Sequence, residues 1–81
     1  MTIGTVKGSV WATKEDERLS GCKLMLVQTK NHLIVATDEV GAGVGDKVLV
    51  CYGSSAHVEK NAPIDAAIVG IIDSLESEDF I

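Results

Sequence analysis

The sequence predicts an all-β domain, a small five-stranded OB-like barrel with mainly antiparallel strands and one short helix. Three observations lead to this fold class. The chain has 81 residues, which is the length of a single domain (1–81). Five short segments are apolar or alternate between apolar and polar residues, with glycines or polar loops between them. No segment is repeated along the chain.

The first predicted strand is 5–13, where small or apolar residues alternate with larger polar ones. Trp11 is the exception, a large aromatic residue on the polar face. We expect it either to cover an end of the barrel or to meet a neighbouring subunit. The charge-rich segment 14–21 follows, and it predicts a surface loop with room for one helical turn.

The next two strands, 22–29 and 33–40, are predicted to form a hairpin. Only Lys30, Asn31 and His32 separate them, and three polar residues suit a tight connection. We expect His32 to be an exposed polar residue of this turn.

The fourth predicted strand is 47–52, and the segment 54–61 after it suits a helix of one to two turns. Ser54 or Ser55 is a suitable N-cap for that helix, because a serine oxygen accepts a hydrogen bond from the first turn. Pro63 prevents the helix from continuing.

The last predicted strand, 66–72, is apolar throughout with Gly70 inside it. Because it lacks alternation, both of its faces must be covered. We expect the barrel interior on one side and a second subunit on the other. The segment 74–81 is acidic, and we expect a loosely held tail.

Three glycines lie within five positions between the third and fourth strands: Gly41, Gly43 and Gly45. A dinucleotide-binding loop needs a further glycine at position 46 and a helix after it, but the chain has Asp46 and then a strand. Acidic neighbours would also repel phosphate. We therefore interpret the cluster as structural, since glycine permits positive φ and close backbone approach at a barrel corner.

No group of residues predicts catalysis, a cofactor or a metal site. Ser54, Ser55 and His57 lie close in sequence, but only their proximity supports a nucleophile. The two histidines lack the spacing of metal ligands. Cys22 and Cys51 lie in apolar runs, so we expect buried, reduced thiols rather than a disulfide.

Composition limits the classes of partner. The net charge of -5 argues against nucleic acid, whose binding depends on clustered Lys and Arg. The chain is 46% hydrophobic but only 4% aromatic, which leaves enough aliphatic residues for a core and a subunit face. We expect neither a signal peptide nor a membrane span, and therefore a soluble, cytosolic oligomer.

Several sequence blocks, in this order and spacing, resemble the EutN/CcmL family. The most specific blocks are GAGVG (41–45), GSSA (53–56) and PIDAAIVGIID (63–73), and the match covers residues 3 to 73. This family comprises the pentameric vertex proteins of bacterial microcompartment shells. The resemblance implies a non-enzymatic, cofactor-free protomer that forms a homopentamer in the shell, within the bacterial cytoplasm, beside hexameric and trimeric shell proteins.

We also expect certain residues of this chain to lie at a subunit interface or at the fivefold axis. The candidates are Gly41, Ala42, Gly43, Val44, Gly45, Ser54, Ser55, His57 and Ile68. His57 departs from the family pattern, because many members carry arginine there. The alternative function is a small OB-like binding module for an oligonucleotide or small ligand, which would need aromatic platforms in a basic groove.

Overall fold

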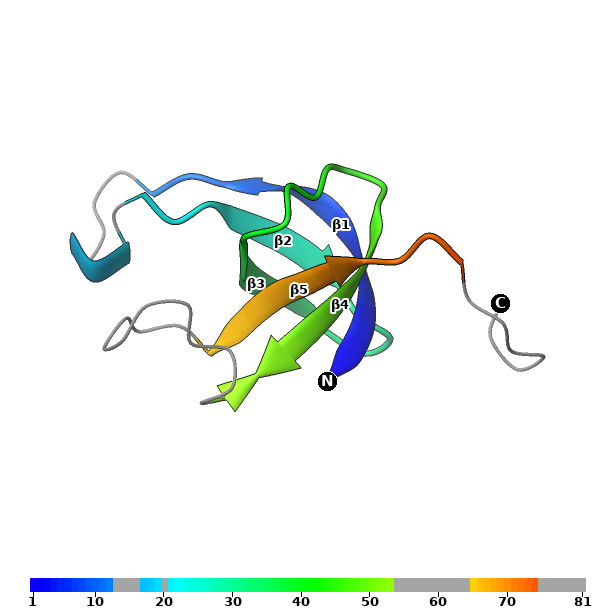
Figure 1. The fold of residues 1–81 in the computed structure, drawn as a ribbon. Coiled ribbons are helices and arrows are strands. Elements are labelled where there is room, and N and C mark those ends of the chain that lie inside the picture. Colours follow the sequence, from blue (N-terminus) through cyan, green and yellow to red (C-terminus); the bar gives the residue numbers. More distant parts are fainter. Residues whose placement is uncertain (13–16, 20, 54–64, 75–81) are drawn as a thin grey trace.

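The protein folds as a closed five-stranded barrel, described by a computed structural model for residues 1–12, 17–19, 21–53 and 65–74 (Figure 1). Its elements are β1 (Thr2–Val10), the 3₁₀ turn η1 (Glu17–Leu19), β2 (Leu24–Gln28), β3 (Leu33–Asp38), β4 (Lys47–Tyr52) and β5 (Ala66–Ile71). The strands close in the order β1-β2-β3-β5-β4. Every pairing is antiparallel except that of β3 with β5. The predicted fold class is confirmed.

The first strand lies three residues earlier than the predicted 5–13. Its beginning pairs with β4, from Thr2 opposite Val50 to Thr5 opposite Lys47. The alternation of apolar and polar residues within 5–13 could not predict this pairing, because β4 is distant in the sequence. The register with β2 shifts between Val6 and Gly8, and a bulge of this kind bends a strand so that it can pair on both sides.

The core fills the barrel with aliphatic side chains from all five strands. It consists of Val6, Met25, Val27, Ala36, Ala42, Val48, Val50, Ala66 and Ile68. Gly4 permits this closure, because a Cβ there would lie 2.5 Å from Val27 Cγ1 and 3.0 Å from the Gln28 carbonyl oxygen. Only glycine lets β1 approach β2 this closely.

The strand β5 is covered on its inner side. Ala66, Ala67 and Ile68 are buried, whereas Val69 and Ile71 remain 44% and 41% exposed in the single chain. Ile68 is 1% exposed, so its side chain belongs to the core and is not available to a second subunit. The fully apolar run gave no period from which to separate inner from outer positions.

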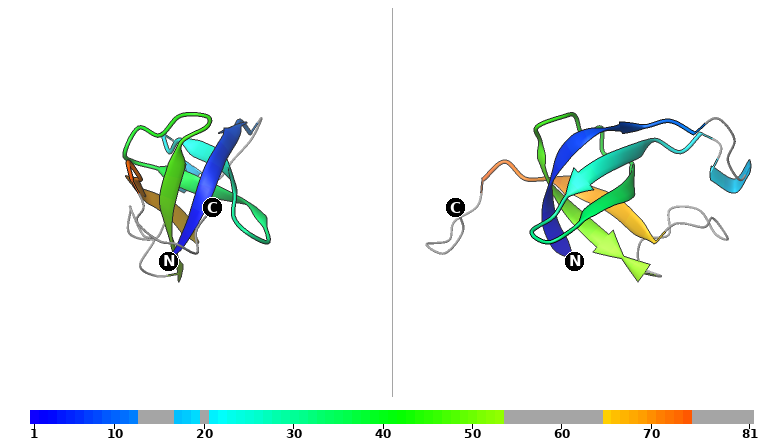
Figure 2. Two further views of the ribbon diagram at one scale, coloured as in Figure 1. Left: turned by 90° about the vertical axis from the view of Figure 1, so that its right-hand side faces the viewer. Right: turned by 180° about the vertical axis from the view of Figure 1, so that it is seen from behind.

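The connections follow the sequence with one correction. The β2–β3 turn is tight and His32 is exposed, and η1 is the helical turn expected within 14–21. Figure 2 shows η1 beyond the ends of β1 and β2, away from the barrel. Both cysteines are free, but Cys22 and Cys51 are partly exposed rather than buried. Alternation along β4 turns Val50 inward and its neighbour Cys51 outward.

The predicted helix in 54–61 and residues 75–81 of the predicted tail lie outside the described residues. Within the part of the chain that the structure describes, no helix is both long enough and apolar enough to cross a membrane.

Candidate functional site

The glycine-rich loop 39–46 crosses one end of the barrel from β3 to β4 (Figure 1). Gly45 donates its backbone N–H to the Val6 carbonyl oxygen at 2.9 Å, and Val6 donates to the Asp46 carbonyl oxygen at 2.9 Å. Ala42 is 2% exposed and belongs to the hydrophobic core. The loop therefore plugs this end of the barrel and is fastened to β1.

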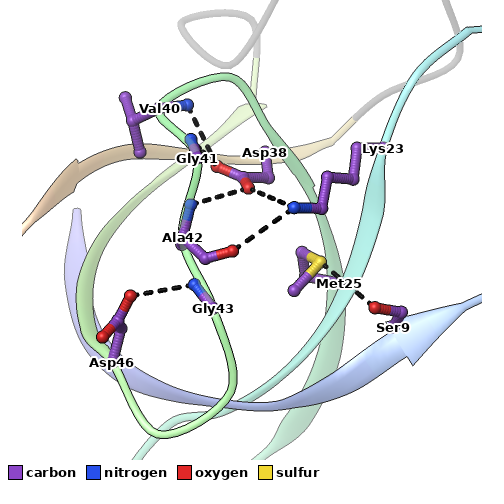
Figure 3. Close-up of polar contacts among 9 residues, drawn as sticks. All are labelled: Ser9, Lys23, Met25, Asp38, Val40, Gly41, Ala42, Gly43 and Asp46. Carbon is purple, nitrogen blue, oxygen red and sulfur yellow. Dashed lines mark hydrogen bonds and ion pairs between the residues drawn. The ribbon is translucent and has the colours of Figure 1, made fainter.

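The side chain of Asp38 sets the shape of this loop (Figure 3). Its Oδ1 accepts hydrogen bonds from the backbone N–H groups of Val40 at 3.0 Å and Gly41 at 3.1 Å. Its Oδ2 accepts the N–H of Ala42 at 2.9 Å and forms an ion pair with Lys23 Nζ at 3.5 Å. The carboxylate side chain is 0% exposed, so these contacts replace its water. Charge-assisted hydrogen bonds of this kind are stronger than neutral ones.

In this arrangement the backbone N–H groups of the glycine loop are already bonded and are not available to a phosphate group. Consecutive backbone N–H groups form a concavity that attracts anions. Here the Asp38 carboxylate already occupies the N–H groups of residues 40–42. Asp38 is one of the acidic neighbours that the sequence predicts to repel phosphate, and in the structure its carboxylate is also the ligand of these N–H groups. An Asp directly before a turn is the signal for such side-chain-to-backbone bonding.

A second carboxylate fixes the far part of the loop. The backbone N–H of Gly43 donates to Asp46 Oδ2 at 2.8 Å, and the Asp46 N–H donates to the Gly43 carbonyl oxygen at 3.0 Å. Lys23 Nζ also reaches the Ala42 carbonyl oxygen at 3.4 Å. The loop is thus held at both ends by contacts within the same chain (Figure 3).

The three glycines have different roles. Gly41 and Gly45 have φ values of 80° and 94°, a conformation that side chains with a Cβ rarely adopt. Gly43 has no positive φ, and a Cβ there would meet only Asp46 Oδ2 at 3.8 Å. The expected conformational requirement therefore holds at two of the three positions.

The apolar residues of the loop point alternately out and in. Val40 is 42% exposed, Ala42 is 2% exposed and Val44 is 70% exposed. Ala42 packs in the core, and Val40 and Val44 project outward from the hydrogen-bonded backbone of the loop. Two exposed aliphatic side chains on one hydrogen-bonded loop make this loop a candidate contact surface.

A second apolar surface lies on the outside of β1, β2 and β3. Alternation turns Met25, Val27 and Ala36 inward, and therefore Leu24, Leu26, Leu33 and Val35 outward. Gly8, Leu26 and Val35 form one row across the three strands. Leu33 and Val35 are 56% and 44% exposed. We call this surface the β1–β3 face.

The remaining predicted interface residues divide into two groups. Ser54, Ser55 and His57 lie outside the described residues. Ile68 lies in the core, as noted above. The structure thus brings Gly41–Gly45 together in one loop, whereas Ile68 lies on β5 opposite Asp38 and shares the hydrophobic core with Ala42.

The described residues form no cluster of three or more His, Cys, Asp or Glu side chains that could hold a metal ion. A cleft of about 370 Å³ lies between the end of β1 and the start of β2, lined by residues that include Trp11, Cys22 and Lys23. Trp11 is 90% exposed, so it does not cover a barrel end within the chain.

Comparison with known proteins places this chain in a family. A family model described as "Ethanolamine utilisation protein EutN/carboxysome" matches residues 1–73. The chain belongs to the EutN/CcmL family. The shell vertex protein GrpN of Rhodospirillum rubrum is 40% identical over 87 residues, covering 95% of this chain and 98% of that protein. The carboxysome shell vertex protein CcmL of a Nostoc species is 37% identical over 90 residues, covering 98% and 89%.

A solved structure gives the same result in three dimensions. The pentameric microcompartment shell protein GrpN from Rhodospirillum rubrum superposes with a TM-score of 0.86 at 42% identity, covering 95% of this chain and 98% of that one. The family resemblance noted in the sequence is confirmed, and these relatives do not favour the ligand-binding alternative.

Proposed function

We propose that five copies of this chain form a ring that caps the fivefold vertices of a bacterial microcompartment shell. The observation that carries this proposal is the close match, over nearly the whole length of both chains, to a shell protein described as pentameric. The curated relatives GrpN and CcmL are likewise named as shell vertex proteins.

The physical basis of this function is geometric. Six-sided tiles cover flat facets, and a closed polyhedron needs fivefold units at its corners. A head-to-tail contact between two different surfaces of one chain closes into such a ring when its rotation is one fifth of a turn. The exposed valines of the loop and the β1–β3 face are two different apolar surfaces of the kind that this contact needs.

The proposed role is structural and does not involve catalysis or a cofactor. The partners are further copies of the chain and the hexameric and trimeric tiles of the shell, and the location is the shell within the bacterial cytoplasm. The buried Asp38 is consistent with a structural role, because its hydrogen bonds stabilise a loop.

Co-expression with hexameric shell tiles, followed by electron microscopy, tests vertex capping. We expect closed polyhedral shells with density for this protein at the corners, and open or tubular tile assemblies when it is omitted. Closed shells of the same shape in its absence, with the protein unbound, would refute the proposed function.

A further inference from the structure

We propose that the subunit contact is made by the loop 39–46 of one copy, which docks through Val40 and Val44 on the β1–β3 face of the next copy. This inference rests on the proposed pentamer and names the two surfaces that form it. Both surfaces are exposed in the single chain, so neither covers the other within it.

The first argument is that the loop is already in a fixed shape. Asp38 binds three of its backbone N–H groups, Asp46 binds a fourth, and two hydrogen bonds tie its end to β1. A docking element that is ordered before binding loses little conformational entropy when it binds. Val40 and Val44 are therefore presented in one arrangement.

The second argument is that the β1–β3 face has space to receive an aliphatic side chain. Gly8 lies in the same row as Leu26 and Val35. A Cβ added at Gly8 would meet no heavy atom within 4 Å, so this position is open space beside Leu26. A valine from another copy can therefore lie against Leu26 without a clash at Gly8, in an apolar contact.

Charge supports the same pairing of surfaces. Among the described residues of β1, β2, β3 and the β2–β3 turn, the exposed Lys and Arg side chains are Lys7 and Lys30, and no exposed acidic side chain lies there. The loop 39–46 itself carries the exposed Glu39 and the partly exposed Asp46, and the half-exposed Lys23 beside it is paired with the buried Asp38. Two apolar surfaces surrounded by opposite charges are typical of a complementary interface. Because one chain carries both surfaces, this pattern favours a second copy of the chain as the partner.

The test places charges in the centre of the proposed contact. Val44→Asp and Val35→Lys are each expected to abolish the pentamer in native mass spectrometry. An unpaired charge in an apolar contact is expected to weaken each contact at least about tenfold. Over the five contacts of a ring, the assembly constant then falls by about 100,000-fold. The double variant is expected to regain pentamers, because every contact then joins opposite charges.

A mixture of the two single variants gives a second, independent result. Each contact from the Val44→Asp loop to the Val35→Lys face is favourable, and the reverse contact is the wild-type pair. A ring of five cannot alternate completely, so one of its five contacts joins two like variants and only that contact carries the penalty. We therefore expect the mixture to form pentamers that contain both variants, whereas neither single variant forms pentamers alone.

Three controls separate a lost contact from a lost fold. Val44→Thr keeps the shape without charge and should weaken assembly much less than Val44→Asp. Ser74→Asp places the same charge on an exposed residue beyond β5 and should leave pentamers intact. If circular dichroism shows that Val35→Lys does not fold, the exposed residues Glu39 and Lys30 are exchanged instead. Glu39→Lys and Lys30→Glu should each lose the pentamer, and the double variant should regain it.

The outcomes distinguish the two proposals. A monomeric wild-type chain would refute the pentamer itself. A pentameric wild type with pentameric single variants would overturn only the assignment of these surfaces. Folded double variants that stay monomeric would overturn it as well.

Discussion

At the scale of single residues, Asp38 is the group on which the glycine loop depends. Its buried carboxylate is the shared acceptor for the N–H groups of Val40, Gly41 and Ala42, and Lys23 balances its charge. Removing this acceptor leaves the buried N–H of Ala42 without a partner and the part-buried N–H groups of Val40 and Gly41 without their acceptor. A buried donor without a partner costs more than the net gain from a hydrogen bond. The position of the outer valines therefore depends on a residue that lies beneath them.

Asp38→Ala is expected to lower the free energy of unfolding by about 2–4 kcal/mol, since several N–H groups lose their acceptor at once. Urea unfolding at a fixed protomer concentration measures this. Asp46→Ala is the matched control, because that carboxylate accepts one exposed N–H, and it should cost about 1 kcal/mol or less. Equal losses in both variants would show that Asp38 does not have the role described here.

The glycines of the loop were predictable only in part from the sequence. Their clustering predicted a turn with positive φ, and Gly41 and Gly45 do have positive φ. It did not separate them from Gly43, because φ depends on hydrogen bonds to Asp38 and Asp46 that no local pattern displays. Gly4 was missed for a related reason: its neighbour Val27 is 23 positions away in the chain, and only barrel closure brings it near.

At the scale of elements, the strands were predictable and their partners were not. Alternation and apolar runs located all five strands, and 47–52 agrees with β4 to the residue. The order β1-β2-β3-β5-β4, including the parallel contact of β3 with β5, depends on long-range packing. Because the sequence does not show which residues of β5 face inward, it predicted Ile68 at the interface. In the structure Ile68 lies in the core and its neighbour Val69 is exposed.

Gly4→Ala tests the closure of the barrel. A methyl group there would lie 2.5 Å from Val27 Cγ1, so β1 or Val27 must shift. We expect a loss of about 1–3 kcal/mol in the free energy of unfolding, as for other overpacked sites. Gly70→Ala is the control in β5, because its nearest neighbour, Leu49 Cβ, lies at an ordinary 3.8 Å. If Gly4→Ala unfolds at the same urea concentration as the wild type, β1 and β2 do not pack this closely.

At the scale of the whole molecule, a short chain with a modest core has reason to associate. Small domains bury a smaller share of their surface than large ones, and a partner subunit supplies what is missing. Among the described residues, large apolar side chains such as Leu33, Val35, Val44 and Val69 remain exposed. A ring of five copies would cover such surfaces and provide the fivefold unit that a closed shell requires.

Native mass spectrometry of the purified chain at micromolar concentration tests this claim most directly. We expect one dominant particle with five copies of the 8.5 kDa chain, a mass of about 42.5 kDa. The particle should persist on dilution through the micromolar range. A stable 8.5 kDa monomer, or a closed ring with another number of subunits, would contradict it.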